Sequence, residues 1–176
     1  MFLNNPFFNY FIIILVLFIA FIIVTLLINK SKVNMLYSEI ELFTRDKGFS
    51  FEKVKGKPYD FILRKDNKTI LVNILSIPSN SSVTINSKST WCLRYGGKRV
   101  GRSYPNKRYL NELVPFLSLK SQDEEKIVLF YPSTEKVLKY VNESDICEIK
   151  PKDISYGYRA MTVKDFYNEF DNLFNK

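Results

Sequence analysis

The first thirty residues are dominated by an apolar run. Phe7 to Ile28 is a stretch of 22 nearly all apolar residues, and no charged side chain precedes Lys30. About 20 such residues cross the hydrocarbon core of a bilayer as a helix. The run therefore predicts one transmembrane helix, and it lacks the basic leader and small-residue cleavage site typical of a cleaved signal peptide.

The charges beside this run predict its orientation. Lys30 and Lys32 follow it, whereas no Lys or Arg precedes it. By the positive-inside rule, the part of the chain after the run should lie in the cytoplasm. The two cysteines are far apart in the sequence, which fits a reducing compartment. We therefore expect a single-pass protein of the cell membrane, with residues 1–30 as its anchor and residues 31–176 as one cytoplasmic domain.

A second helical pattern follows the anchor. Leu36, Ile40 and Phe43 recur at three- and four-residue spacing, and Gly48 is placed to end the helix. Glu39 lies in line with this stripe, at its edge. Its carboxylate could face the fold or remain solvated, and the spacing leaves both open.

Two strand-like runs then form a predicted hairpin. Asp60 to Arg64 is the first run, residues 65–68 are the turn, and Thr69 to Ile77 is a second run that is apolar on both faces. A strand with two apolar faces is central in its sheet and covered on both sides. Asn73 is the only amide within it, and a buried amide needs hydrogen-bond partners.

The other elements complete a mixed α/β pattern. Residues Asn106 to Leu117 have helical spacing, with Pro115 as an expected kink or break. Val163 to Phe174 predicts a closing helix, with Thr162 and Asp165 resembling a capping box. Further strands are predicted at Phe49 to Lys55, Ser82 to Asn86, Ser89 to Tyr95, Ile127 to Tyr131, Lys136 to Val141 and Ile146 to Ile149.

Charge and composition narrow the possible chemistry. All 26 Lys and Arg and all 18 Asp and Glu lie after the apolar run, so the part of the chain that follows the run carries the whole formal charge of +8. This favours anionic partners, although a biased composition rich in Lys, Asn and Ile gives the same excess. The chain has no histidine. Serine–histidine and cysteine–histidine hydrolases and histidine-ligated metal sites are therefore excluded.

A basic run after the predicted hairpins is the candidate nucleic-acid site. Its six cations fall within 15 residues that contain no acid, and tyrosines lie among them. Such a run can track phosphates while the tyrosines stack on unpaired bases, or it can be a solvated surface. The candidate residues are Arg94, Lys98, Arg99, Arg102, Lys107 and Arg108.

The order of elements resembles a known superfamily. Helix, strand, strand beginning with Asp60, turn, central apolar strand, then helix and strand is similar to the PD-(D/E)xK restriction-endonuclease-like nucleases. The membrane helix before the domain and the tryptophan and Gly-Gly hairpin after the central strand look like the nuclease-related domain (NERD) of bacterial proteins. The likeness covers roughly Val33 to Tyr131. It implies one central mixed sheet flanked by helices.

The superfamily's catalytic motif is only partly present. Its acids hold Mg²⁺ through oxygens, and its lysine helps to activate the attacking water. Matched to this chain, Tyr59-Asp60 stands for the Pro-Asp pair, Asn73 for the second acid and Leu75 for the lysine. Asp60 alone is retained, as a weak candidate for a metal ligand. Mg²⁺ would be a cofactor only if other residues, such as Glu39, Glu112 and Lys88, had taken over the missing roles.

The expected function is therefore that of a membrane-anchored nuclease-like domain without catalysis. It would act as a binding or interaction module, with a protein or anionic lipid as its partner. A second expectation is nucleic-acid binding through the basic run at 94–108. A third is a metal-dependent nuclease whose catalytic residues have migrated.

Overall fold

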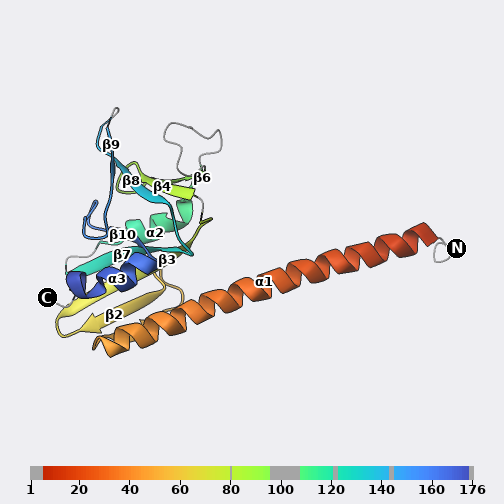
Figure 1. Ribbon diagram of the computed structural model, residues 1–176, viewed down its shortest axis with the longest axis horizontal. Helices are drawn as coiled ribbons and strands as arrows, with labels where there is room; N and C mark the ends of the chain where they lie inside the picture. Colours follow the sequence, from red (N-terminus) through yellow and green to blue (C-terminus); the bar gives the residue numbers. More distant parts are fainter. Residues whose placement is uncertain (1–5, 80, 96–107, 121–122, 143–144, 175–176) are drawn as a thin grey trace. The chain divides into compact units, whose positions relative to one another are not determined.

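The computed structural model describes residues 6–79, 81–95, 108–120, 123–142 and 145–174 (Figure 1). The chain divides into two compact units, Met1–Phe43 and Thr44–Lys176. The element order confirms the expected mixed α/β class.

The N-terminal unit is helical. Helix α1 runs from Pro6 to Asp46, so the two predicted helices form one continuous element. Its segment from Tyr10 is long and apolar enough to cross a membrane, with a mean hydropathy of 3.6 in its most apolar part. The large apolar side chains from Tyr10 to Ile28 are all exposed. A helix that is apolar all round and exposed in this way is typical of a membrane span.

The end of α1 begins the second unit, and Gly48 ends the helix as predicted. Gly48 has a φ of +82°, a left-handed conformation that glycine adopts without a steric cost. Its N–H donates to Arg45 O at 2.9 Å, and Phe49 N–H donates to Thr44 O at 2.9 Å. This pair of bonds is the Schellman motif, which satisfies carbonyls at a helix end.

The first sheet contains the predicted hairpin at its centre. Its strand order is β1-β2-β3-β7-β10, so β3 is the middle strand, as its two apolar faces predicted. Strand β2 is antiparallel to β1 and β3, whereas β3, β7 and β10 are parallel. The strands are β1 (Ser50–Lys53), β2 (Phe61–Lys65), β3 (Lys68–Ser76), β7 (Glu124–Tyr131) and β10 (Arg159–Thr162).

The remaining strands form a second mixed sheet in the order β6-β5-β4-β8-β9. Strands β4 and β8 are parallel, and the other neighbours are antiparallel. The resemblance implied one central sheet, whereas the structure distributes the strands over two. The strands are β4 (Ser81–Ile85), β5 (Trp91–Tyr95), β6 (Arg108–Tyr109), β8 (Lys136–Tyr140) and β9 (Ile146–Glu148).

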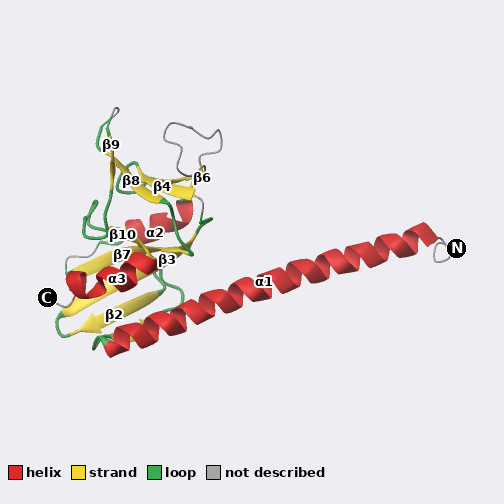
Figure 2. Ribbon diagram, in the orientation of Figure 1, coloured by secondary structure: helices red, strands yellow, loops and turns green. Residues whose placement is uncertain are grey.

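The sheets and helices of this unit are layered. One face of the first sheet shares a buried core with the second sheet and with α2 (Val114–Leu117), including Leu75, Trp91 and Phe116. Helix α3 (Val163–Phe174) packs against β7 and β10 (Figure 2). Its Phe170 ring lies 5.2 Å from the Phe49 ring, edge to face. The first sheet is therefore covered on both faces, which buries its central strand.

Helix α3 begins and ends where the sequence predicted. Thr162 Oγ1 accepts the N–H of Asp165 at 3.1 Å, and Asp165 Oδ2 accepts the N–H of Thr162 at 3.3 Å. This reciprocal pairing is a capping box. The capping-box prediction is confirmed.

The helix predicted from Asn106 to Leu117 is wrong in length. Strand β6 and a 3₁₀ turn, Asn111–Leu113, occupy most of the described part, and only Val114–Leu117 is α-helical. Pro115 lies at the start of α2 rather than kinking a longer helix. Proline is favoured there because the first helical N–H groups have no intrahelical acceptor.

A tight turn before β10 gives a testable prediction. Tyr156 and Gly157 have φ values of +54° and +84°, the geometry of a type I′ turn. Replacing Tyr156 with Asn should raise the free energy of unfolding by about 0.5–1 kcal/mol, because asparagine tolerates the left-handed conformation better than tyrosine. Urea unfolding of the full-length protein in detergent, followed by the fluorescence of the single tryptophan, measures this. Tyr156→Ala is the control, and equal stability of the Ala and Asn proteins would contradict the account.

Candidate functional site

Asp60 lies at the open end of the β2–β3 hairpin and is built into it. Its carboxylate oxygen Oδ2 accepts the backbone N–H of Ile74 at 2.6 Å. Its own N–H donates to Val72 O at 2.8 Å, and its carbonyl accepts the N–H of Val54 at 2.9 Å. Asp60 lies directly before β2, and its side chain satisfies the N–H of Ile74 on β3. Asp60 is therefore bonded both to Val54, just after β1, and to β3.

Asn73 lies at the same end of the hairpin as Asp60. Its side-chain nitrogen donates to Pro58 O at 3.2 Å, two residues before Asp60. The amide therefore ties the chain that enters β2 to the central strand. A half-buried amide needs such a partner, and the loop carbonyl supplies it.

Leu75 is part of the hydrophobic core. Its side chain is 5% exposed and belongs to the cluster that joins the two sheets. Its neighbour across the parallel ladder is Phe130, which is fully buried. The position that would carry a catalytic lysine is filled by an apolar side chain with apolar neighbours.

These three residues do not fit a Mg²⁺ ion. Mg²⁺ prefers several oxygen ligands with carboxylates among them, and the motif positions offer one carboxylate, already bonded to Ile74 N–H, and one neutral amide. The described residues contain no cluster of three or more Asp, Glu or Cys side chains able to hold a metal.

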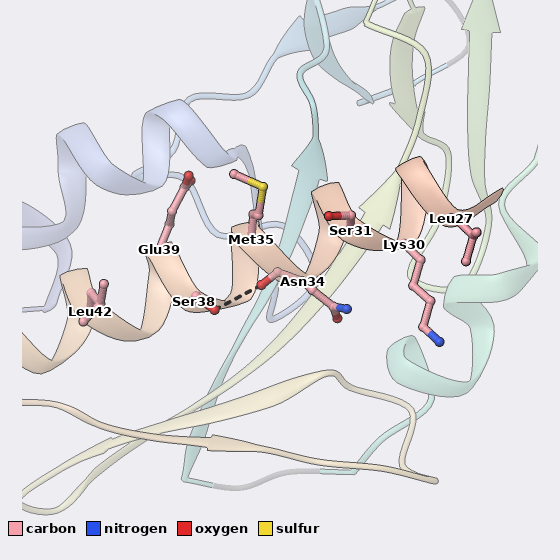
Figure 3. A pocket seen from close by; sticks show the side chains of 8 residues that line it. All are labelled: Leu27, Lys30, Ser31, Asn34, Met35, Ser38, Glu39 and Leu42. Atoms are coloured by element: carbon pink, nitrogen blue, oxygen red, sulfur yellow. Dashed lines mark hydrogen bonds between the residues drawn. The ribbon is translucent and has the colours of Figure 1, made fainter. Parts of the chain in front are cut away.

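Glu39 lies on α1, within the N-terminal unit. Its side chain is exposed, so of the two orientations that the sequence left open the solvated one is observed. It borders a shallow hollow lined by one face of α1 from Leu27 to Leu42 (Figure 3). The bond drawn there joins Ser38 Oγ to Asn34 O within the helix. A second hollow surrounds the β2–β3 turn and includes Asp66 and Lys68, at the end of the hairpin opposite to Asp60.

Two residues of the basic run are described. Arg94 on β5 donates to the Tyr140 hydroxyl at 2.8 Å, and its guanidinium lies 5.7 Å from the centre of that ring. Arg108 on β6 pairs with Glu112 at 2.6 Å, and both side chains are exposed. The other four candidates, Lys98, Arg99, Arg102 and Lys107, lie outside the described residues.

The guanidinium groups of Arg94 and Arg108 already have partners within the protein, which leaves fewer of their N–H groups for a ligand. Arg94 and Tyr140 share one face of the second sheet, and the arginine reaches across β4 to meet the tyrosine. A surface ion pair such as Arg108–Glu112 contributes little to stability. Glu112, one of the acids considered for a migrated site, has this cation as its neighbour.

Sequence reasoning missed a buried polar pair. Lys126 is 8% exposed on β7, its ammonium donates to Leu119 O, and it lies 5.2 Å from the centre of the Tyr158 ring. Burial lowers the pKa of Lys126, and the nearby ammonium of Lys88 lowers it further. The strand was expected to begin at Ile127, one residue too late to place this lysine in the sheet. A charged residue preceding an apolar run gives no local signal of burial.

Tyr158 gives a pH-dependent prediction. Its hydroxyl donates to Leu117 O, and burial raises its pKa above the usual 10.0. Tyr158→Phe should lower the free energy of unfolding by about 1 kcal/mol at neutral pH through the lost hydrogen bond. Above pH 10.0 the unfolded state releases its proton before the folded state does, so the wild-type advantage should shrink as the pH rises. Urea unfolding at neutral and alkaline pH measures both, and an advantage that grows above pH 10.0 would contradict the assignment.

The arrangement as a whole is a hairpin end held by Asp60 and Asn73 above an apolar core. Its polar groups bond to backbone groups of neighbouring segments. Comparison of the chain with protein-family models, curated proteins and solved structures finds no match.

Proposed function

We propose that the chain is a membrane-anchored, catalytically inactive nuclease-like domain that serves as a binding or interaction module. One observation carries the proposal. The Asp60 carboxylate, the one retained group of the motif, accepts a backbone N–H of the central strand at 2.6 Å. Asn73 likewise bonds to a loop carbonyl, and Leu75 is buried. Groups used in this way stabilise the hairpin and leave no charged pair for metal-assisted hydrolysis.

The order of elements supports the nuclease-like ancestry. The end of α1, strands β1, β2 and β3, helix α2 and strand β7 follow one another in the order on which the resemblance rests. The five-stranded sheet runs β1-β2-β3-β7-β10, with Asp60 directly before β2. Strand β5, which carries the tryptophan of that likeness, lies in the second sheet. The proposed domain is therefore similar to the PD-(D/E)xK nucleases and to the NERD domain in the order of its elements.

The anchor supports the proposed location. The exposed apolar segment of α1 is long enough to span a bilayer, and Lys30 and Lys32 follow it. We propose a single-pass protein of the cell membrane with its C-terminal unit in the cytoplasm, because cationic flanks stay on the cytoplasmic side. A protease added to intact cells should leave this unit uncut, and cleavage within it would contradict the orientation.

The effect of divalent metal ions on stability tests the proposal that the motif positions bind no metal. A ligand that binds the folded state alone raises its stability by mass action. Urea unfolding of the full-length protein in detergent should give the same midpoint with and without millimolar Mg²⁺ or Mn²⁺. A midpoint that rises with metal in the wild-type protein and not in the Asp60→Asn protein would overturn the proposal.

A second candidate function is nucleic-acid binding through the basic run. The run of six cations without an acid favours it, as does the net charge of the domain. Fluorescence anisotropy of labelled single-stranded DNA with the full-length protein, at several salt concentrations, tests it. Binding should weaken steeply with salt and be lost when Arg99, Arg102 and Arg108 are all changed to Ala. Binding unaffected by that change would exclude the run as the site.

A further inference from the structure

The type I′ turn before β10 presents apolar side chains to solvent. Ser155 and Tyr158 exchange backbone hydrogen bonds of 2.8 and 3.0 Å across the turn. Tyr156, at its first central position, is 42% exposed, and Ile154 beside it is 60% exposed. Tyrosine is disfavoured in the left-handed conformation that this turn imposes. Strain retained at an exposed residue points to a use for its side chain.

One lysine contacts this turn, and two more precede it in the chain. The Lys139 ammonium on β8 lies 4.7 Å from the centre of the Tyr156 ring. Lys150 and Lys152 are exposed on the segment that leads into the turn. Among the described residues none of the three is in an ion pair. The one acid of the segment, Asp153, accepts the backbone N–H of Lys150 at 2.9 Å.

We propose that residues 150–157, the turn loop, together with Lys139, form a second contact with the membrane, on an anionic lipid surface. Lysines bind the anionic headgroups, while a tyrosine and an aliphatic side chain enter the interfacial region. Clusters of lysine beside exposed apolar residues suit this boundary, since each class of side chain meets its own layer. The exposed isoleucine favours a lipid surface over nucleic acid, because an apolar side chain adds nothing to phosphate binding and can enter the apolar layer of a bilayer.

The proposed anchoring of the chain supports this choice of partner. An anchored domain stays near the bilayer, so a weak second contact becomes effectively intramolecular. The inference rests on that anchoring and not on the presence or absence of nuclease activity. Vesicle flotation tests the anchoring and tryptophan quenching tests the turn-loop contact, so a failure of one can be told from a failure of the other.

Tryptophan quenching in proteoliposomes tests the contact. The full-length Tyr156→Trp protein is reconstituted in phosphatidylcholine vesicles, with or without phosphatidylserine, that contain a lipid nitroxide-labelled near the headgroup. The native Trp91 is 1% exposed and supplies a constant background. We expect the emission of the introduced tryptophan to fall by roughly half with phosphatidylserine and to recover when salt rises from ~0.1 to ~0.5 M. In neutral vesicles it should remain unquenched.

Matched variants sharpen the result. Tyr109→Trp introduces the probe at a site that is 53% exposed on β6, and this protein should not be quenched. Changing Lys139, Lys150 and Lys152 to Gln in the Tyr156→Trp protein should return its emission to the neutral-vesicle level. Near-identical circular dichroism spectra of all variants show that the fold is kept.

The inference would be overturned by equal quenching with and without phosphatidylserine, or by quenching of the Tyr109→Trp protein alone. An emission shift produced by single-stranded DNA in solution and not by lipid would also overturn it. Flotation of the vesicles reports on the anchor separately. Protein that fails to float with them contradicts the proposed anchoring, whereas protein that floats and is not quenched contradicts the turn-loop contact alone.

Discussion

A Leu75→Lys protein is expected to lose about 3–5 kcal/mol of unfolding free energy, because its ammonium would lie uncompensated in an apolar core. Leu75 is 5% exposed and faces Phe130 across the β3–β7 ladder. Single domains are stable by only about 5–15 kcal/mol, so this change would bring the protein close to unfolding. Urea unfolding in detergent, followed by tryptophan fluorescence, measures the loss.

The controls for Leu75→Lys separate the effect of the buried charge from the effect of the changed side-chain shape. Leu75→Met keeps the volume and polarity of the site and should cost less than about 1.5 kcal/mol. Burial should lower the pKa of the introduced lysine, so the loss should shrink as the pH rises toward the usual lysine value. A Leu75→Lys protein as stable as the Leu75→Met protein would show that this position opens to solvent, as a catalytic lysine requires.

An Asp60→Ala protein is expected to be less stable by about 1.5–3 kcal/mol, since Ile74 N–H would lose a charged acceptor at the hairpin end. Asp60→Asn keeps an oxygen at the same place and should recover most of the loss. The same unfolding measurement compares the two. If alanine is tolerated as well as asparagine, the carboxylate does not hold the hairpin, and its retention needs a different explanation.

The sequence predicted those elements whose patterns are local. The final helix was placed correctly because its apolar spacing and its capping residues, Thr162 and Asp165, lie within a few positions of one another. Strand β3 was predicted to be central because both of its faces are apolar, and it is the middle strand of its sheet. Gly48 ended α1 through a backbone conformation that glycine adopts freely.

Elements that depend on distant partners were missed. Strand β10, Arg159–Thr162, is too short to show alternation, and it becomes a strand because it pairs with β7, about thirty residues earlier. The division of the strands into two sheets also could not be predicted from local sequence patterns. It depends on β4 pairing with β8 across more than fifty residues, and no periodicity within either strand encodes that choice.

Matching the motif selected Asp60 and Asn73 as candidate residues, and both lie at one end of the hairpin. Their role as a functional site stays a prediction. The sequence could not show that each side chain bonds to a backbone group, because Pro58 and Ile74 come into reach only once the hairpin forms. The burial of Lys126 and the exposure of Tyr156 likewise follow from tertiary contacts.

Cleavage by the full-length protein tests the central claim that the motif positions stabilise the hairpin and do not catalyse hydrolysis. Single-stranded, duplex and supercoiled DNA are incubated with wild-type and Asp60→Asn protein and with Mg²⁺ or Mn²⁺. We expect no metal-dependent product from either protein. Metal-dependent cleavage by the wild-type protein that the Asp60→Asn change abolishes would contradict the account.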